Sequence, residues 1–397
     1  MKVYCEKVLF NKDTKSYEVL FDFNKNKDLL AFSERFQLSI NEENETLFIL
    51  TALVFEKYRG FKSGFWYELP KDFFENFTLV NRHSENSRLK ATLEYDADKG
   101  GLLNIRENRV YENMEFHEYN EYIGHDGRMG LYEYMKERKC YSENPDFVVR
   151  NVGCGNINEI RTKDFWLIYD LGGDIKYDDA KMKSVFCRIN FNQEFICVIS
   201  HWDLDHYRAI LDLQDHQLKK MEKIIVPTKM PNTMQLRKTL DRLKKLKIDI
   251  EMIPPAFSYT RGSGTRVHLV SLGKFGNIEI FRSTDGSNIN QSGIALSIEG
   301  KNKIAVLVGD HHYPQIINSM LTSRVTKKYE FVIPHHGGHA GKFDEKKWRK
   351  INFSGGALST KRGRYRNLPR KEIEDFFVVN RNFHCTETTK LDYTTTL

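Results

Sequence analysis

The chain has no run of about 18 or more consecutive apolar residues, the length that a helix needs to cross a bilayer. Its first fifteen residues, MKVYCEKVLFNKDTK, lack the order of basic, apolar and small residues that marks a secretory signal peptide. The sequence also contains no low-complexity tract and no internal repeat. We therefore expect a globular, cytoplasmic protein with no membrane partner, and 397 residues are enough for two or three domains.

Paired cysteines are missing as well. The six cysteines lie far apart and none belongs to a C-x-x-C pair, which argues against a cysteine zinc knuckle and indicates reduced thiols.

The charge balance is only mildly basic, with 61 basic and 54 acidic residues and a formal net charge of +7. This excess suits a polyanionic partner such as nucleic acid without requiring one.

The first 145 residues are predicted to form a β-rich N-terminal domain. KVYCEKVLF (2–10) and SYEVLFDF (16–23) flank a polar turn and predict a hairpin. Seven aromatic residues between 61 and 77 favour a hydrophobic core over an exposed base-stacking surface. The polar segment YSENPD (141–146) is the best candidate for the domain boundary. The role of this domain is not evident from its residues, and a protein partner or a homo-oligomer could form through it.

From residue 146 to residue 397, apolar strands alternate with amphipathic helices. Strand-like runs include FWLIYDL (165–171), EFICVIS (194–200), KIAVLVGD (303–310) and YEFVIP (329–334). The segment YRAILDLQDHQLKKM (207–221) predicts a helix. This mixture predicts an α/β layered domain in which helices cover two sheets.

Four of these strands end in carboxylates or imidazoles. The side chains, in chain order, are Asp170, then His201, Asp203, Asp205 and His206, then Asp310, and finally His335 and His336. A carboxylate or imidazole at a buried strand end costs free energy unless it is paired, and a divalent metal supplies that pairing. Imidazole nitrogens and carboxylate oxygens suit zinc or manganese. The pattern therefore favours a metal site, with a hydrogen-bonded polar cluster as the alternative.

The segment HWDLDH (201–206) resembles the H-x-H-x-D-H motif of the metallo-β-lactamase fold superfamily, with Asp203 in place of the second histidine. This variant resembles the metallo-β-lactamase-like domain of the bacterial competence DNA-uptake channel proteins and that domain's soluble relatives. The companion motifs of this subgroup stand in the subgroup's order: NVGCGN (151–156), NINQSGIAL (288–296), VLVGD (306–310), PHHGGHAGK (334–342) and STKRGRYRNLP (359–369). The resemblance implies a metallo-β-lactamase αββα sandwich over residues 146–397, with two mixed sheets covered by helices, preceded by the β-rich N-terminal domain.

The resemblance also implies two bound divalent metal ions, zinc or manganese. Carried over residue by residue, the expected ligands are His201, Asp203, Asp205, His206, Asp310 and one or both of His335 and His336. Among them, the side chains expected to serve catalysis most directly are Asp205, His206 and Asp310.

Three further residues, Asp170, Asn290 and Ser292, are expected to support the ligands through hydrogen bonds. Three departures from the family stand beside these matches, and the smallest is HHGG (335–338) in place of HHGS. No G-H-T-x-G-type segment, which carries the third ligand histidine of typical hydrolases, lies between His206 and Asp310. The late segment RYRNLP (364–369) has also lost the histidine that the family carries there.

The activity that the resemblance implies is hydrolysis by a hydroxide that two metals activate. A phosphodiesterase or nuclease acting on nucleic acid is favoured, in a bacterial defence or mobile-element context. A basic loop supplies candidate phosphate contacts, with a solvated loop as the alternative, and its residues are Lys361, Arg362, Arg364 and Arg366. Two other functions stay open: a metallo-hydrolase of a cyclic nucleotide, lactone or thioester, and a non-catalytic binding or sensing module.

Overall fold

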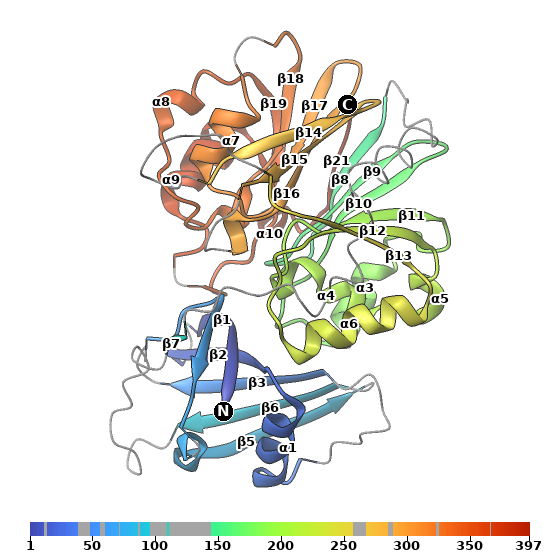
Figure 1. Cartoon of the computed structure of the whole chain (residues 1–397). Coiled ribbons are helices and arrows are strands. Elements are labelled where there is room, and N and C mark those ends of the chain that lie inside the picture. The colour runs from blue at the N-terminus through green and yellow to red at the C-terminus, as the bar shows by residue number, and fades with distance from the viewer. Residues whose placement is uncertain are drawn as a thin grey trace. The chain divides into compact units, whose positions relative to one another are not determined.

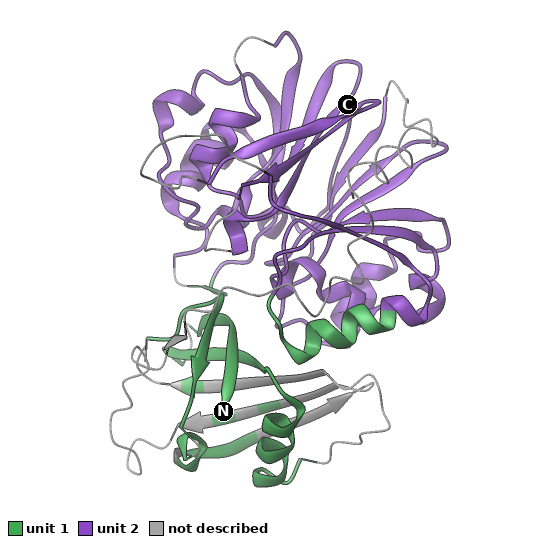
Figure 2. Ribbon diagram, in the orientation of Figure 1, with its two compact units in different colours: residues 1–114, 231–242, 363–366 green, residues 115–230, 243–362, 367–397 purple. Residues whose placement is uncertain are grey.

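The computed structural model describes residues 1–11, 14–38, 48–55, 60–70, 72–85, 88–95, 109–110, 144–256, 267–284, 289–322, 325–365 and 367–397. The chain divides into two compact units, coloured green and purple in Figure 2. Unit 1 comprises residues 1–114, 231–242 and 363–366, and unit 2 comprises residues 115–230, 243–362 and 367–397. The boundary expected at 141–146 begins outside the described residues, so the division after residue 145 stays a prediction.

Unit 1 is built on a sheet that has seven strands among the described residues, in the order β5-β6-β3-β2-β1-β4-β7. The predicted hairpin is confirmed, because β1 and β2 pair antiparallel from Val3 opposite Phe23 to Asn11 opposite Ser16. The elements, labelled in Figure 1, are β1 Lys2–Asn11, β2 Ser16–Phe23, α1 Asn26–Arg35, β3 Phe48–Phe55, β4 Phe65–Glu68, the 3-10 helix η1 Phe73–Asn76, β5 Phe77–Glu85, β6 Arg88–Tyr95 and β7 Arg109–Val110.

Aromatic side chains fill the core of unit 1. Phe32 of α1 meets both Phe21 of β2 and Phe74 edge to face, and such aromatic pairs add about 0.5–1.5 kcal/mol beyond the area they bury. Of the seven aromatic residues between 61 and 77, all except the half-buried Phe65 are buried. They therefore form a core, and the alternative of an exposed base-stacking surface is wrong for these residues.

Unit 2 contains the strands and helices of the predicted α/β domain. In the first half these are β8 Asp146–Val149, β9 Ile157–Arg161, β10 Trp166–Leu171, α3 Asp179–Phe186, β11 Phe195–Val198, α4 Leu204–Asp212, α5 Asp215–Leu218, β12 Met221–Pro227, α6 Met234–Lys245, of which residues 234–242 are assigned to unit 1, and β13 Asp249–Ile253. In the second half they are β14 Leu269–Phe275, β15 Ile278–Ser283, the 3-10 helix η3 Ile289–Gln291, β16 Ile294–Glu299, β17 Lys303–Leu307, α7 Tyr313–Ser319, β18 Lys328–Val332, the 3-10 turn η4 Pro334–Gly337, α8 Glu345–Trp348, β19 Phe353–Leu358, α9 Lys371–Ile373, the π-helix η5 Glu374–Val379, β20 His384–Cys385, α10 Thr386–Thr389 and β21 Tyr393–Thr396.

Two mixed sheets, each with seven strands among the described residues, face one another in unit 2. The first has the order β13-β12-β11-β10-β9-β8-β21 and the second the order β14-β15-β16-β17-β18-β19-β20. Strands β10 to β13 are parallel in the first sheet, as are β17 to β20 in the second. One apolar core lies between the sheets, with Leu167, Val198 and Ile225 from the first and Leu296 and Leu307 from the second. Each such aliphatic side chain contributes about 1.5–3 kcal/mol when fully buried.

Helices cover the outer faces of both sheets (Figure 1). Helix α4 packs against β10, and α7, α8 and η5 pack on the second sheet through a cluster that includes Trp348, Phe331 and Phe377. The predicted αββα sandwich and the separate β-rich N-terminal sheet are therefore confirmed. None of the helices in the described part of the chain is long and apolar enough to cross a membrane.

The single helix predicted over residues 207–221 is wrong, because the structure divides it into α4 and α5. Helix α4 ends at Asp212, and Leu213 and Gln214 then adopt extended backbone angles. The Gln214 and Gln217 side chains form reciprocal hydrogen bonds with the backbone of the first turn of α5. These bonds satisfy N–H groups at a new helix start, which favours the interruption over a continuous helix.

A buried carboxylate links two segments of unit 1. Asp22 of β2 accepts hydrogen bonds from the backbone N–H of Gln235 (2.8 Å) and of Phe23 (2.7 Å), and Gln235 lies in the first turn of α6. Burial raises the pKa of Asp22 to about 6, in spite of these N–H donors and the nearby Arg237, which lower it. The folded chain therefore keeps a proton on Asp22 at a pH where the unfolded chain has released it.

This shift predicts a pH-dependent difference between the wild type and Asp22→Asn. Between pH 3.8, the ordinary pKa, and pH 6 the folded state binds more protons than the unfolded state, so the wild type loses stability as the pH rises. Relative to Asp22→Asn, its free energy of unfolding should fall by up to about 3 kcal/mol across that window and stay level above it. Urea unfolding at a series of pH values measures the difference, with the exposed Asp72→Asn as control. A constant difference from pH 4 to pH 7 would contradict the expectation.

Candidate metal centre

The segment HWDLDH connects the end of β11 to the start of α4. Asp203 has extended backbone angles and sits at the N-cap position, so Asp205 falls in the first turn of the helix. The backbone N–H of His206 donates to the Asp203 carbonyl (2.8 Å), which closes the turn. All four candidate ligands of this segment, His201, Asp203, Asp205 and His206, are buried, with exposed fractions of 2% or less. One short turn therefore places two imidazoles and two carboxylates in the interior.

Asp170 and Ser200 orient the two imidazoles of this turn. His206 Nδ1 lies 2.8 Å from Asp170 Oδ2, and His201 Nδ1 lies 3.0 Å from Ser200 Oγ. Ser200 in turn donates its backbone N–H (2.7 Å) and its hydroxyl (3.0 Å) to the Asp170 carboxylate. This network places the proton of each imidazole on Nδ1, so the lone pair of each Nε2 is available to a ligand or metal. Asp170 thus makes hydrogen bonds to His206 and Ser200, and its expected support of metal ligands stays a prediction.

Close backbone packing brings the neighbouring loops against this turn. A Cβ atom at Gly172, which follows β10, would lie 1.8 Å from the carbonyl oxygen of Asp205. Gly309, which precedes Asp310, has a positive φ of 51°, and a Cβ there would lie 2.6 Å from the Ser200 side chain. Glycine is therefore required at both positions by contact with the ligand turn.

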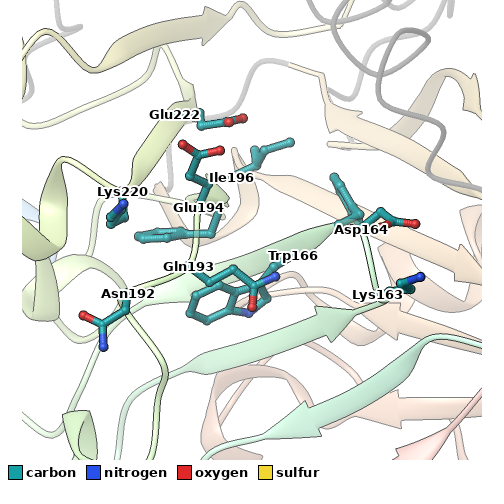
Figure 3. Close-up of a pocket in the computed structure, with 11 residues that line it drawn as sticks. Lys163, Asp164, Trp166, Asn192, Gln193, Glu194, Ile196, Lys220 and Glu222 are labelled. Carbon is teal, nitrogen blue, oxygen red and sulfur yellow. The ribbon is translucent and has the colours of Figure 1, made fainter.

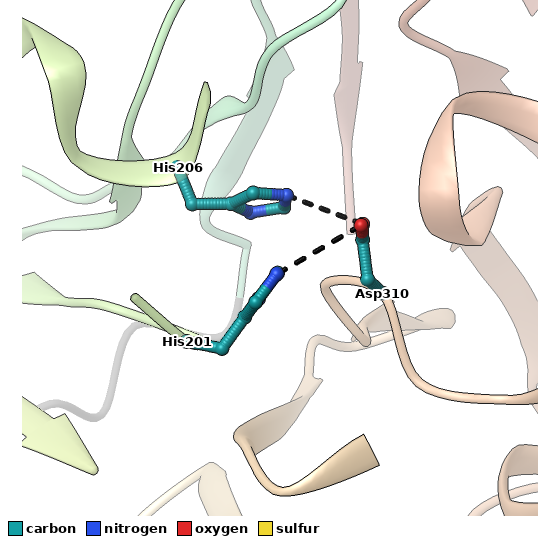
Figure 4. Close-up of side chains that lie close together, drawn as sticks. All are labelled: His201, His206 and Asp310. Carbon is teal, nitrogen blue, oxygen red and sulfur yellow. Dashed lines mark ion pairs between the residues drawn. The ribbon is translucent and has the colours of Figure 1, made fainter. Parts of the chain in front are cut away.

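Asp310 reaches the same point from the second sheet. Its Oδ1 lies 3.2 Å from His206 Nε2, and its Oδ2 lies 3.8 Å from His201 Nε2 (Figure 4). Asn290 donates its side-chain amide to Asp310 Oδ2 (3.3 Å), and His335 Nδ1 lies 2.5 Å from the same oxygen. The Asp310 carboxylate is thus held by residues of its own sheet while it faces two imidazoles of the other.

His336 approaches the turn from its other side. Its Nε2 lies 3.3 Å from Asp205 Oδ2, and its Nδ1 donates to the carbonyl of Ser359 (3.0 Å) just after β19. Both His335 (φ 51°) and His336 (φ 53°) have left-handed backbone angles. Such angles cost free energy for residues other than glycine and are concentrated at functional sites. The strained turn directs the two neighbouring imidazoles to different carboxylates.

The resulting donor atoms fit a bound cation. Two groups of three side chains could each surround an ion, because the ligand atoms within a group all lie within 4.8 Å of one another. The first group is His201, His206 and Asp310, and the second is Asp205, His206 and His336. In the described part of the chain, four of these buried atoms make no hydrogen bond: Nε2 of His201, His206 and His336, and Oδ1 of Asp310. A buried polar atom without a partner costs about 1–3 kcal/mol, and a divalent cation would remove that cost. The two groups share His206, so they lie next to one another around its imidazole.

The charges of the cluster are coupled. Burial alone would raise the pKa of Asp310, but the imidazoles of His335 and His206 outweigh it and hold that pKa well below its usual range. Burial would lower the pKa of His206, yet Asp310 and Asp170 raise it well above its usual value. The ring is therefore readily protonated while no cation is bound, and a metal ion that binds Nε2 would have to displace that proton. His311, which follows Asp310, is buried with no hydrogen bond at either ring nitrogen, and burial together with His201 and Arg282 lowers its pKa to about 3. The Asp310 carboxylate therefore stays ionised, as a cation ligand must.

The four basic residues of the loop at 361–366 have different surroundings where the structure describes them, and their joint role in phosphate binding stays a prediction. Lys361 lies in unit 2, with its ammonium 5.6 Å from the centre of the Tyr177 ring. Arg362 forms ion pairs with Glu374 and Glu387, and these partners raise its pKa although burial lowers it. Arg364 belongs to unit 1, where its carbonyl accepts a hydrogen bond from Phe10, and Arg366 lies outside the described residues.

Some contributors to the site were not evident from the sequence. The Ser200 hydroxyl, which bridges Asp170 and His201, carries no signal beyond its position next to the motif. The Ser359 carbonyl acts through the backbone, so no side-chain pattern could reveal it.

Ser292 is buried, and its carbonyl accepts a hydrogen bond from Arg282 (2.9 Å). Its expected support of a ligand stays a prediction.

A hollow of about 370 Å³ lies elsewhere, at the amino ends of the parallel strands β10, β11 and β12 (Figure 3). Its lining includes Lys163, Trp166, Gln193, Glu194 and Lys220. The candidate ligands stand at the carboxyl ends of β10 and β11, so the hollow is separate from the metal centre.

No protein-family model and no curated protein sequence matches the chain. Among solved structures, the metallo-β-lactamase fold protein YhfI from Bacillus subtilis is 14% identical over 64% of this chain and 100% of its own, with a TM-score of 0.35. Igni18, a metallo hydrolase from Ignicoccus hospitalis KIN4/I, is 11% identical over 64% of this chain and 98% of its own, with a TM-score of 0.36. A mutant of the CmlA β-hydroxylase is 13% identical over 63% of this chain, with a TM-score of 0.35, and the match spans only 54% of that protein. The likeness concerns the fold alone, and the narrower resemblance to DNA-uptake proteins stays a prediction.

The two adjacent histidines should differ in metal binding. His336 presents a buried Nε2 without a hydrogen bond, whereas Nδ1 of the 30% exposed His335 faces the Asp310 oxygen. We expect His336→Ala to weaken binding of Mn²⁺ or Zn²⁺ by at least about tenfold, and His335→Ala to retain it. Calorimetric titration of the metal-stripped chain measures both affinities. Equal losses in the two variants would show that His335 is also a ligand.

Proposed function

We propose that this chain is a metal-dependent hydrolase of phosphodiesters, with nucleic acid as the substrate. The observation that supports it most is the convergence of buried Nε2 and carboxylate oxygen atoms from separate strand ends, several of them without hydrogen-bond partners in the described part of the chain. A cluster held together only by its own hydrogen bonds would satisfy these atoms internally. A site built to hold cations leaves them open.

The residues suited to hold the ions are those that meet at the turn. His201 and Asp310 would serve one ion and Asp205 and His336 the other, with Asp203 next to His201 (His201 Nε2 to Asp203 Oδ2, 3.7 Å). His206 would complete one of the two sites, because its Nδ1 faces Asp170 and its Nε2 has a single lone pair. Divalent ions bound there would supply Lewis acidity and lower the pKa of water enough to make it a nucleophile near neutral pH. The three carboxylates favour Mn²⁺ more than a set of histidines would, and Zn²⁺ also suits the imidazoles.

The chain's own residues keep the donor atoms in place. Asp170 and Ser200 fix the planes of two imidazoles, and the Ser359 carbonyl fixes the third. Asn290 holds one oxygen of Asp310 by a hydrogen bond. Because each donor is supported by a second group, the site needs little rearrangement when substrate arrives, and such preorganisation is a large part of catalysis.

Two features support a phosphodiester as substrate. The donor set contains carboxylates that favour the ions used in phosphoryl transfer, and the formal charge of the chain is +7. Lys361 follows Ser359 by two residues, and among the described residues its ammonium forms no ion pair, so its charge is open to an anion. Arg362 already has two carboxylate partners, which leaves Lys361 as the better candidate of that loop for a phosphate contact.

The experiment that tests this function compares substrate classes. The purified full chain, with its metal content measured, is assayed with Mn²⁺, Zn²⁺ and Mg²⁺ on bis(4-nitrophenyl) phosphate and on single- and double-stranded DNA and RNA. Cyclic nucleotide, lactone and thioester substrates are run in parallel. We expect phosphodiester and nucleic-acid cleavage that disappears with a chelator. Turnover confined to a lactone or thioester would refute the phosphodiesterase assignment, and absence of bound metal with no turnover would refute the hydrolase.

The support given by Asp170 leads to a quantitative expectation. Asp170→Asn removes the carboxylate that accepts the Nδ1 proton of His206, so we expect metal affinity or kcat to fall by about 10–100-fold. Glu194→Gln, an exposed change at the separate hollow, is the matched control and should keep wild-type values. Titration calorimetry and phosphodiester turnover measure the two effects. An Asp170→Asn variant that binds metal and turns over like Glu194→Gln would contradict the role of Asp170.

A further inference from the structure

A basic surface lies on the helices that cover the second sheet. The segment KFDEKKWRK (342–350), which contains α8, has five basic and two acidic residues, and all five basic side chains are exposed. Trp348 is the one large apolar residue of α8, and it is fully buried against the sheet. The exposed face of this segment therefore presents mainly positive charge.

Arg381 extends this surface from the end of η5. Its guanidinium carbon lies 4.6 Å from the centre of the Phe376 ring and 5.5 Å from the centre of the Phe353 ring. The guanidinium of Arg349 lies 5.9 Å from the same Phe376 ring. Two guanidinium groups thus share one aromatic ring, and stacking of this kind fixes their planes while leaving N–H groups at their edges.

The positive charge of this pair is only partly compensated among the described residues. Among the residues that the structure describes, Arg381 has no carboxylate partner, and Arg349 pairs only with Glu345, one turn away on an exposed helix. Burial and, to a smaller extent, the neighbouring Arg349 lower the pKa of Arg381. Exposed ion pairs such as Arg349–Glu345 contribute little free energy. An anion that contacts both guanidinium groups would compensate the remaining positive charge.

We propose that Arg349 and Arg381, with Lys346 and Lys350, form a second binding surface for the phosphate backbone of a nucleic-acid substrate. This inference rests on the proposed function, since it names the substrate as a polymer longer than the metal centre alone needs. Planar guanidinium groups recognise phosphate by paired hydrogen bonds, and such contacts position a strand without reading its sequence.

The distance along β19 sets the length of strand required. Phe353, under Arg381, begins β19, and the strand ends at Leu358, directly before the Ser359 carbonyl that holds His336. A six-residue strand spans about 17 Å, and phosphates of one strand recur about every 3.4 Å along a duplex. We therefore expect a substrate that contacts both the metal centre and this surface to extend over at least about five nucleotides.

Binding and turnover are measured on full-length variants. The double variant Arg349→Gln/Arg381→Gln is compared with Lys183→Gln/Lys219→Gln, which removes two exposed positive charges from the helical side of the first sheet. Affinity for fluorescent 12-nucleotide and 3-nucleotide DNA is measured by anisotropy in EDTA at several salt concentrations. Turnover of bis(4-nitrophenyl) phosphate is measured with Mn²⁺. If the loss of the stacked arginines prevents folding, the double variant Lys346→Gln/Lys350→Gln tests the same surface in their place.

We expect the arginine variant to bind the 12-mer about tenfold more weakly and the 3-mer as the wild type does. Its slope of log affinity against log salt should fall by about 1.4, the value for two phosphates on a single strand, and its turnover of the small phosphodiester should not change. If the arginine, lysine and control variants all bind the 12-mer with equal affinity, the proposed phosphate-binding surface is wrong. If the wild type cleaves no phosphodiester but the arginine variant still binds the 12-mer more weakly than the control variant, the proposed hydrolase activity is wrong and the proposed binding surface is supported.

Discussion

The buried imidazole nitrogens of the HWDLDH turn are the constraint on which the rest of the site depends. An imidazole ring that is held through Nδ1 points its Nε2 atom toward the centre of the site. Among the described residues, the Nε2 atoms of His201, His206 and His336 have no hydrogen-bond partner. Asp170 and Ser200 enforce the choice, because they occupy the Nδ1 side of two rings. A cation bound at these nitrogens would recover the free energy lost by burying them, so the proposed metal binding would also stabilise the fold.

The two-sheet sandwich brings two sets of parallel strand ends together. Strands β10 and β11 deliver Asp170 and the turn, and β17, β18 and β19 deliver Asp310, the histidine pair and the Ser359 carbonyl. Neither sheet holds a complete donor set, and the shared apolar core holds them in register. Strain is concentrated in the same place, at the positive φ angles of Asp170, His335 and His336, where packing on both sides over-determines the backbone.

Local patterns predicted the strand ends well, because apolar runs followed by ionisable residues mark the edge where parallel strands stop. They identified HWDLDH, Asp310 and PHHGG, and the expected layered fold followed from the alternation of strands and helices. They could not separate His335 from His336, since that depends on left-handed angles imposed by tertiary contact. They also could not show that Arg362 is neutralised by Glu374 and Glu387, or that residues 231–242 belong with unit 1, because both follow from long-range packing.

The ion pairs of Arg362 affect how the proposed hydrolase would hold a polymer. Because Arg362 is paired with two carboxylates, the neighbourhood of the candidate metal centre offers the charge of Lys361 and the charge of any cations that bind there. Such a site can bind one phosphate but would bind a flexible strand weakly, because ordering the strand costs conformational entropy. The stacked guanidinium groups at the other end of β19 have their entropy already reduced by the rings beneath them. A rigid anchor one strand length away therefore complements a rigid metal centre, and both are fixed to the same β-strand.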